Sequence, residues 1–398
     1  MLSEKMMKLG KKRSVIRELF EYGNRRKAEI GAENVFDFSL GNPSVNPPAC
    51  VKETIKRLLE TEDDIALHGY TSAQGDAKVR EAVADYINRS FGRHLTGGHI
   101  YMTVGAAASL TISLKAMAVE GDEFITFSPF FPEYRVFVEN AGGTLKVVPC
   151  NTEDFQIDRE LFEQAITPGT KAVILNSPNN PSGVVLSEET VKGICEVMEK
   201  KQAEYGHAIY LITDEPYREL VYDDNIQVPY LMNYYKNTLV CYSFSKSLSL
   251  PGERIGYIAV CEEMEEWEDM YAAICGAGRS MGYVCAPSLF QRVAAECLGK
   301  TADISIYKKN RDLLYNGLTA SGYRCVKPDG AFYLFVQALE EDANAFCERA
   351  RKYELLLVPG DDFGCPGFVR ISYCVTTEMI EKSLPAFEKL AAEYRGQA

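Results

Sequence analysis

Short apolar runs alternate with helix-like segments along the chain up to residue 260. The runs are rich in β-branched and aromatic residues, which is typical of buried strands. They lie at 99–104, 123–127, 144–148, 172–175, 208–213, 238–242 and 255–260. Most intervals have a helical pattern, such as 187–205, where Ser187 is placed to cap the helix and Glu188 and Glu189 lie at the positive end of its dipole. This alternation predicts an α/β fold with a mainly parallel sheet of seven strands, covered by helices on both faces.

The pattern changes in the last hundred or so residues. Here the sequence predicts a helix, a strand, a second helix, a second strand and a final helix, at 291–315, 330–335, 343–353, 369–373 and from Thr377. This order of elements predicts a second, smaller α+β domain.

Length and charge restrict what the chain can be. Its 398 residues correspond to two or three domains at about 150 residues each. The net charge of −13 argues against nucleic acid or an anionic membrane as partner, because both attract positive charge. Residues 95–114 form one long stretch free of Asp, Glu, Lys and Arg, but their glycines and polar residues fit a strand, a turn and a helix better than a membrane span.

Cysteines and histidines give no sign of a metal site. The 12 cysteines include no C-x-x-C pair, and the four histidines, at 68, 94, 99 and 207, are dispersed. Residues 1–13 are basic and polar, without the apolar segment of a signal peptide. We therefore expect a soluble cytoplasmic protein whose cysteines are reduced.

The most informative stretch follows the strand that ends at residue 242. Ser243 and Ser245 precede Lys246, and Arg254 follows it eight residues later. A lysine just after a buried strand can be desolvated and surrounded by cations, which lowers its pKa and makes it a Schiff-base nucleophile. The serines and the arginine supply donors for a phosphate. Taken alone, a lysine flanked by serines is more often a solvated loop residue.

Two further segments follow neighbouring predicted strands. Residues 176–183 have the sequence NSPNNPSG, and Asp214 and Tyr217 follow the next strand. The simpler reading of the first segment is a plain turn, and that of the second is an acidic residue at a strand end. Together with Lys246, however, they resemble the active site of the class I and II aminotransferases, the fold-type-I enzymes that use pyridoxal 5′-phosphate. The resemblance extends over residues 41–370, with the motifs in the family's order and spacing.

The resemblance implies a catalytic role for several residues. Lys246 would bind the cofactor covalently and then move the α-proton of the substrate. Asp214 would pair with the pyridine nitrogen, and Asn180 and Tyr217 would hold the phenolic oxygen of the ring. Phe131 corresponds to the aromatic residue that stacks on the ring, although a packing role in the core is the simpler reading.

The phosphate site departs from the family pattern. Gly105 is followed by Ala106, Ala107 and Ala108, where family members commonly have a polar side chain. The backbone N–H groups at the start of this helix can still bind an anion. The side-chain contacts would then come from Ser243, Ser245 and Arg254.

Two features implied by the resemblance concern assembly. Tyr70 resembles the tyrosine that reaches the phosphate from the partner subunit, which implies a homodimer with shared active sites. A surface tyrosine before a loop is the simpler reading. The resemblance also leads us to expect a large cofactor-binding domain at 46–290 and a small domain formed by both chain ends, 1–45 and 291–398.

Substrate capture requires a cation for the α-carboxylate. Arg370 lies within an apolar predicted strand and matches the family arginine that forms a bidentate pair with this group. Gly41 resembles the family's backbone donor to the same carboxylate, and Asn180 lies beside the substrate. Arg279 is a loose analogue of the partner-subunit arginine that binds a distal carboxylate, and Arg135 is a second candidate whose simpler reading is a solvated helix face.

The resemblance implies a ping-pong transfer of an amino group from an L-amino acid to a 2-oxo acid. Aspartate with 2-oxoglutarate is the first pair to expect, and alanine or a broader range of donors comes next. A C–S β-lyase of the cystathionine type on the same scaffold is the enzymatic alternative. A non-catalytic regulator is disfavoured, since only about forty residues precede the first motif, too few for a DNA-binding domain of ordinary size.

Overall fold

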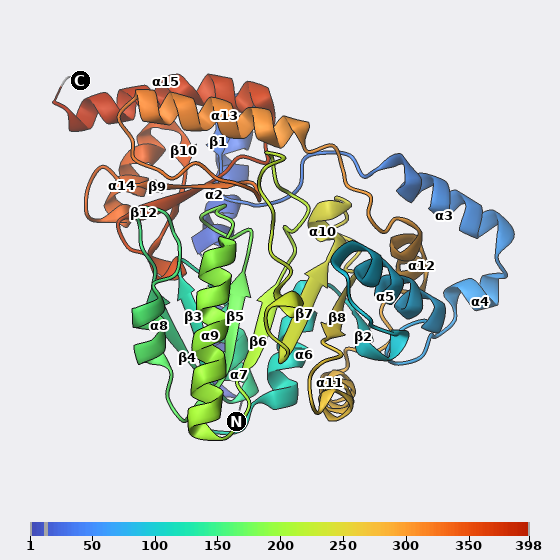
Figure 1. Ribbon diagram of the computed structural model, residues 1–398. Helices are drawn as coiled ribbons and strands as arrows, with labels where there is room; N and C mark the ends of the chain where they lie inside the picture. Colours follow the sequence, from blue (N-terminus) through green and yellow to red (C-terminus); the bar gives the residue numbers. More distant parts are fainter. Residues whose placement is uncertain (1, 12–14, 397–398) are drawn as a thin grey trace.

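The computed structural model describes residues 2–11 and 15–396. Its centre is a seven-stranded sheet with the order β2-β8-β7-β6-β5-β3-β4 (Figure 1). The strands are β2 (Ile100–Thr103), β3 (Glu123–Ser128), β4 (Thr144–Pro149), β5 (Thr170–Asn176), β6 (Tyr210–Asp214), β7 (Thr238–Ser243) and β8 (Gly256–Val260). Only β8 runs antiparallel to its neighbours β2 and β7, and the other pairs are parallel. The predicted fold class is confirmed, and each of the seven predicted runs overlaps one strand.

Helices cover both faces of this sheet. One face packs against α6 (Ala106–Met117), α7 (Glu133–Ala141) and α11 (Trp267–Met281). The other packs against α3 (Ala49–Thr61), α5 (Ala77–Phe91) and α12 (Ser288–Glu296) at one end, and against α8 (Arg159–Ala165) and α9 (Glu188–Tyr205) at the other. Successive strand residues alternate between these cores: Leu239 packs on the first face and Val240 on the second. Both faces are therefore dry, which explains the nearly continuous apolar runs.

The predicted cap of α9 is present. The Ser187 side chain accepts a hydrogen bond from the backbone N–H of Thr190 at 3.0 Å, and Glu188 and Glu189 lie in the first turn. The helix ends at Gly206, whose φ of 73° is left-handed and is readily adopted by glycine. This helix thus begins and ends where its own residues satisfy the free backbone groups.

A second layer lies beside the carboxyl ends of the parallel strands and contains residues 15–37 together with the C-terminal part of the chain, whereas residues 4–11 lie at the opposite end of the large sheet (Figure 1). Its three-stranded antiparallel sheet has the order β11 (Val358–Pro359), β12 (Phe368–Ser372) and β9 (Tyr333–Gln337). Near the N-terminus, β1 (Phe36–Asp37) pairs in parallel with β10 (Leu355–Leu356). The helices of this layer are α2 (Val15–Ile30), α13 (Ser305–Ala320), α14 (Ala343–Ala350) and α15 (Thr377–Tyr394).

The remaining helices are short. They are α1 (Glu4–Lys11), α4 (Asp64–His68) and α10 (Phe244–Ser247), with 3-10 turns at Ala32–Asn34, Gly97–His99, Leu231–Asn233, Arg351–Tyr353 and Asp361–Phe363. In the part of the chain that the structure describes, no helix is both long enough and apolar enough to span a membrane. Residues 1, 12–14, 397 and 398, which fall within the expected small domain, lie outside the described residues.

Three predicted elements of this second layer have different limits. The single helix expected at 291–315 is wrong, because α12 ends at Glu296 and the chain passes through Gly299, with φ of 73°, before α13 begins. The predicted strand at 330–335 starts only at Tyr333, since Ala331 has a φ of 56° that is incompatible with a strand. The predicted helix at 343–353 ends as a 3-10 turn over its last three residues.

Candidate functional site

A cavity of about 400 Å³ lies where the parallel strands end and the second layer begins. Loops after β5, β6 and β7 form one wall, and residues of β9, β11 and β12 form the other. Twelve of the predicted site residues line it: Gly41, Ala106, Ala107, Phe131, Asn180, Asp214, Tyr217, Ser243, Ser245, Lys246, Arg254 and Arg370. The carboxyl edge of the sheet is thus where the chemistry-bearing residues converge, as the sequence predicts.

Lys246 lies in α10, one turn after β7. Its Nζ donates to the backbone oxygen of Gly41 at 2.7 Å and lies 5.1 Å from the centroid of the Phe332 ring. Burial, with the nearby charges of Arg370 and Arg254, lowers the pKa of this amine to about 8. A substantial neutral fraction near neutral pH makes Lys246 a good nucleophile and base.

The pKa of Lys246 predicts a pH dependence for covalent capture of a carbonyl compound by the cofactor-free protein. The neutral amine is the reactive form, so the rate of capture should rise about tenfold per pH unit below pH 8 and level off above it. Stopped-flow absorbance after addition of pyridoxal phosphate measures this rate. A profile that keeps rising to pH 10 would show that Lys246 titrates like an ordinary lysine.

Asp214 ends β6 at the floor of the cavity. Its Oδ2 accepts a hydrogen bond from the Tyr134 hydroxyl at 2.6 Å, whereas Oδ1 is buried and has no partner among the described residues. Only 5% of the residue is exposed, and burial raises the pKa of the carboxyl to about 7. An unpaired buried carboxylate oxygen is costly unless a donor occupies the cavity. A protonated ring nitrogen is such a donor.

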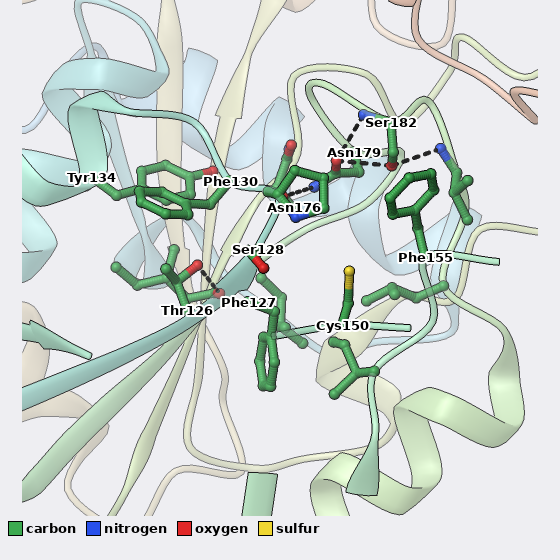
Figure 2. Close-up of a pocket in the computed structure, with 16 residues that line it drawn as sticks. Thr126, Phe127, Ser128, Phe130, Tyr134, Cys150, Phe155, Asn176, Asn179 and Ser182 are labelled. Atoms are coloured by element: carbon green, nitrogen blue, oxygen red, sulfur yellow. Dashed lines mark hydrogen bonds between the residues drawn. The ribbon is translucent and has the colours of Figure 1, made fainter. Parts of the chain in front are cut away.

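Asn180 is positioned by a rigid loop after β5. Asn176 Oδ1 accepts from the Asn180 backbone N–H at 2.7 Å, and Asn176 Nδ2 donates to the backbone oxygen of Asp214 at 2.8 Å. Figure 2 shows how Asn179 braces the same loop: its Oδ1 accepts from the Ser182 N–H at 3.0 Å and from the Ser182 hydroxyl at 2.9 Å. The turn-forming residues at 176–183 therefore do more than reverse the chain, because they fix Asn180 against Asp214.

Tyr217 lies three residues after Asp214 and is also buried. Its hydroxyl is 2.9 Å from the hydroxyl of Tyr333 on β9. Burial raises the pKa of Tyr217 well above 10, so its hydroxyl remains protonated and can donate a hydrogen bond. This suits a group that holds an anionic oxygen in the cavity.

The phosphate end of the cavity is formed by the start of α6 and by α10. Gly105 has a φ of 94°, and a Cβ there would lie 2.8 Å from Arg254 Nη2, so the absence of a side chain lets the guanidinium approach the helix start. Arg254 Nη1 donates to Ser245 Oγ at 3.5 Å, and Ser243 Oγ donates to Ser245 Oγ at 2.8 Å. Two further wall residues belong to the first turn of α6, namely Ala106 and Ala107. Hydroxyls, a guanidinium and a helix N-terminus together form a suitable anion cradle.

Arg370 lies on β12, on the opposite side of the cavity. It is 2% exposed, and its Nη1 and Nη2 donate to Asn180 Oδ1 at 3.2 Å and to the backbone oxygen of Ser39 at 2.6 Å. Its Nε is buried without a partner among the described residues, and burial lowers the pKa of the guanidinium. A buried cation with a free donor is well suited to a substrate carboxylate.

Other predicted residues lie at or outside this cavity. Phe131 lines the cavity, with its ring edge-on to Tyr134 at 5.7 Å between centroids. Tyr70 is 98% exposed, and neither it nor the exposed Arg279 of α11 lines the cavity of its own chain. Arg135 is exposed on α7, with its guanidinium 6.0 Å from the centroid of the Phe130 ring.

Sequence reasoning missed two tyrosines at the site. Tyr134 pairs with Asp214 across 80 positions, and Tyr333 pairs with Tyr217 across 116 positions. The available signal for Tyr134 was its spacing, since it lies three residues, or about one helical turn, after the predicted site residue Phe131. Tyr333 lies in a strand predicted from its apolar pattern, and nothing local distinguishes its hydroxyl from that of a core tyrosine.

The residues present fit the cofactor that the sequence predicts. Pyridoxal phosphate carries a phosphate, a phenolic oxygen, a ring nitrogen and an aldehyde, and the cavity offers one suitable group for each. The unpaired Oδ1 of Asp214 and the start of α6, whose N-terminal N–H groups have no side-chain cap, are the strongest indications, because this cofactor would supply a partner for each. Tyr217 with Asn180 would hold the phenolic oxygen, and Lys246 would bind the aldehyde carbon.

Comparisons with known proteins give the same result along nearly the whole chain. Residues 33–387 match the family model described as "Aminotransferase class I and II". A probable aspartate aminotransferase of Methanocaldococcus jannaschii is 30% identical over 387 residues, which cover 95% of this chain and 97% of that protein. A crystal structure of an amino transferase from Eubacterium rectale is 58% identical with a TM-score of 0.97, covering 99% of both chains. The aspartate aminotransferase of Thermus thermophilus with maleate is 28% identical with a TM-score of 0.85, covering 98% of this chain and 99% of that one.

Proposed function

This chain belongs to the class I and II aminotransferases, and on that premise we propose that it transfers the amino group of an L-amino acid to a 2-oxo acid in a ping-pong reaction. The family membership confirms the resemblance inferred from the sequence and makes the protein a pyridoxal-phosphate-dependent aminotransferase. The observation that carries the proposed reaction is the cavity, in which an amine of lowered pKa faces an unpaired carboxylate and a buried guanidinium.

The proposed roles follow from the contacts of each residue. When bound, the cofactor supplies an aldehyde that condenses with amines and a protonated ring that accepts electron density from the donor's α-carbon. The Asp214 carboxylate would keep the ring nitrogen protonated, and Tyr134 keeps the other oxygen of that carboxylate occupied. Lys246 Nζ would take the proton from the donor's α-carbon, which requires the neutral amine that its surroundings favour.

The substrate carboxylate is assigned to the side of the cavity formed by the second layer. Arg370 would bind it through Nε and one terminal nitrogen, and the hydrogen bond from Nη1 to Asn180 Oδ1 fixes the plane of the guanidinium. Gly41 would contribute its backbone N–H beside this arginine. Because Arg370 and Lys246 line the same cavity, a substrate held at Arg370 would bring its α-carbon within reach of the Lys246 amine.

Aspartate is the amino donor that we propose first, with 2-oxoglutarate as acceptor, because several relatives are named aspartate aminotransferases. The test is spectroscopic: purified protein is loaded with pyridoxal phosphate, single amino acids are added, and conversion of the visible band to the amine form of the cofactor is followed. Aspartate and glutamate should convert it fastest. Absence of any visible band after addition of pyridoxal phosphate would contradict the assigned roles, and release of pyruvate and ammonia from cystathionine without a 2-oxo acid would assign the lyase reaction instead.

The same measurement tests the proposal that Arg279 binds an acidic side chain from the partner subunit. Arg279→Ala should lower kcat/KM for aspartate by roughly ten- to a hundredfold and leave that for alanine within about twofold, because only aspartate has a distal carboxylate. Arg159→Ala is the matched control, since Arg159 is also an exposed helical arginine and is not a candidate for this role. Equal losses for both donors, or none, would exclude this role of Arg279.

We also propose that the active unit is a homodimer in which Tyr70 reaches the phosphate site of the partner. The support is its position: 98% of Tyr70 is exposed, although a tyrosine usually buries much of its ring. Light scattering should give a mass near twice the 44.4 kDa of one chain. A monomeric mass at full activity would contradict the shared site.

The proposed domain limits and compartment rest on other features. We propose a large domain at 46–290 and a small domain from 1–45 and 291–398. The support is the pairing of β1 with β10, which joins the two parts of the small domain. Limited proteolysis that cuts the protein into parts with other boundaries would contradict these limits.

We place the enzyme in the cytoplasm because all 12 cysteines are free thiols. Recovery of the native protein in an exported fraction would contradict that compartment.

A further inference from the structure

Tyr333 touches three separate parts of the catalytic cavity. It is the first residue of β9, it lines the cavity, and only 3% of it is exposed. Its hydroxyl is 2.9 Å from that of Tyr217, and the guanidinium carbon of Arg370 lies 4.7 Å from its ring centroid. A Cβ at residue 41 would collide with the Tyr333 hydroxyl, so glycine there is what lets the tyrosine reach across the cavity.

The direction of the hydrogen bond between the two tyrosines follows from proton counting. Each hydroxyl has one hydrogen and can accept from other donors. If Tyr217 donates its hydrogen to an anionic oxygen in the cavity, only Tyr333 can donate in the bond between them. The positive charge of Arg370 against the Tyr333 ring makes that hydroxyl the more acidic of the two, and a more acidic hydroxyl is the better donor.

We propose that Tyr333 is a positioning residue with two separable functions. Its hydroxyl donates to Tyr217 and so strengthens the hydrogen bond that Tyr217 gives to the cofactor oxygen. Its ring supports Arg370 in the orientation that binds the substrate carboxylate. This inference rests on the proposed function. It links the two sides of the cavity, because Tyr333 belongs to the second layer and Tyr217 to the loop after β6. The strengthening arises because a hydroxyl that accepts a hydrogen bond becomes a better donor itself.

The hydroxyl function is tested by Tyr333→Phe in the cofactor-loaded enzyme. The visible spectrum of the bound cofactor changes with pH as its link to Lys246 loses a proton, and this loss leaves more negative charge on the oxygen held by Tyr217. A donor at that oxygen stabilises the deprotonated form and lowers the midpoint pH. Removing the Tyr333 hydroxyl should therefore raise the midpoint by roughly half a unit to one unit. The KM for the amino donor should stay within about twofold, because the ring remains under Arg370.

The ring function is tested by Tyr333→Leu, which removes the aromatic face as well. Loss of the stacking contact should raise the KM for the amino donor roughly three- to thirtyfold, in addition to the midpoint shift seen with Tyr333→Phe. The control is Tyr323→Phe, since Tyr323 is equally buried in the same layer but donates to the backbone oxygen of Phe387 at 3.0 Å. This control should change neither the midpoint nor KM.

The outcomes separate this inference from the proposed function. If the wild-type protein gains no visible band with pyridoxal phosphate, the proposed function fails. If the wild-type band titrates normally and Tyr333→Phe has the same midpoint, the hydroxyl function is wrong. If Tyr333→Leu keeps the KM of Tyr333→Phe, the ring function is wrong. Tyr333→Phe differs from the wild type by a single oxygen, so its result remains interpretable should Tyr333→Leu fail to fold.

Discussion

Replacement of Lys246 by alanine should abolish covalent attachment of pyridoxal phosphate, seen as a shift of its absorption to that of the free aldehyde, and lower turnover by roughly four orders of magnitude or more. The amine has two assigned tasks, covalent attachment of the cofactor and transfer of the α-proton, and alanine can perform neither. Among the described residues that line the cavity, no other amine can take its place, because the remaining cations there are the guanidiniums of Arg254 and Arg370, which stay protonated at all relevant pH values. Absorbance titration with pyridoxal phosphate and a coupled transaminase assay measure the two losses separately.

Lys192→Ala is the matched control for this variant. Lys192 lies on the exposed side of α9, where its Nζ is 2.9 Å from Glu188, and it does not line the cavity. An exposed pair of this kind contributes little to stability. The control should therefore keep the wild-type spectrum and turnover. Normal turnover in Lys246→Ala would overturn the assignment of the base.

The sequence predicts the sheet well because its signal is local. All seven strands are short apolar runs, since both faces of the sheet are covered and each strand must be apolar throughout. The ends of four of these strands could likewise be read from the sequence, as polar residues follow the runs at 123–127, 172–175, 208–213 and 238–242. Lys246, Asp214 and Asn180 were found in this way, because each lies within a few residues of a strand end.

The break between α12 and α13 could not be read in this way. Gly299 is a local signal of the break, but the path of the chain between the two helices depends on contacts made after folding, such as the hydrogen bond from the Ala302 N–H to the backbone oxygen of Ser247 at 2.7 Å. The partners of the site residues are also distant in sequence. Arg370 bonds to Ser39 across 331 positions and to Asn180 across 190 positions. A single sequence gives no means of pairing residues at such separations.

Charge in the cavity differs from charge over the whole chain. The net charge is −13, yet the cavity contains the cations Lys246, Arg254 and Arg370. The three lie close enough that Arg370 and Arg254 both lower the pKa of Lys246. An anionic cofactor would therefore relieve repulsion among them as well as form hydrogen bonds. The overall acidity argues against nucleic acid as a partner but says nothing about small anions, which respond to the local field.

Asp214→Asn should lower kcat by roughly two to four orders of magnitude while leaving the fold intact. Asparagine has the same shape, and its oxygen can still accept from Tyr134, but a neutral amide cannot keep the ring nitrogen protonated. The control is Asp329→Asn. Asp329 is also a carboxyl whose pKa is raised by burial, and its Oδ2 accepts from the backbone N–H of Val185 at 3.0 Å. This control should leave kcat unchanged, and an equal loss of kcat in it would mean that the effect is not specific to Asp214.

The same substitution should make the cofactor-free protein more stable at pH 8. The pKa of Asp214 is raised from 3.8 to about 7 in the fold, so the folded protein holds a proton that the unfolded chain releases. The resulting destabilisation is absent below pH 4, grows as the pH rises from 4 to 7 and is constant above 7. Asp214→Asn removes it, so its free energy of unfolding should exceed the wild-type value by roughly 2–4 kcal/mol at pH 8 and by little at pH 4. Chemical unfolding at both pH values measures the difference. If Asp214→Asn and the wild type are equally stable at pH 8, the wild-type carboxylate has a partner in the cofactor-free cavity. If the variant is more stable but has lost turnover, the wild-type protein retains a destabilising charge that catalysis requires.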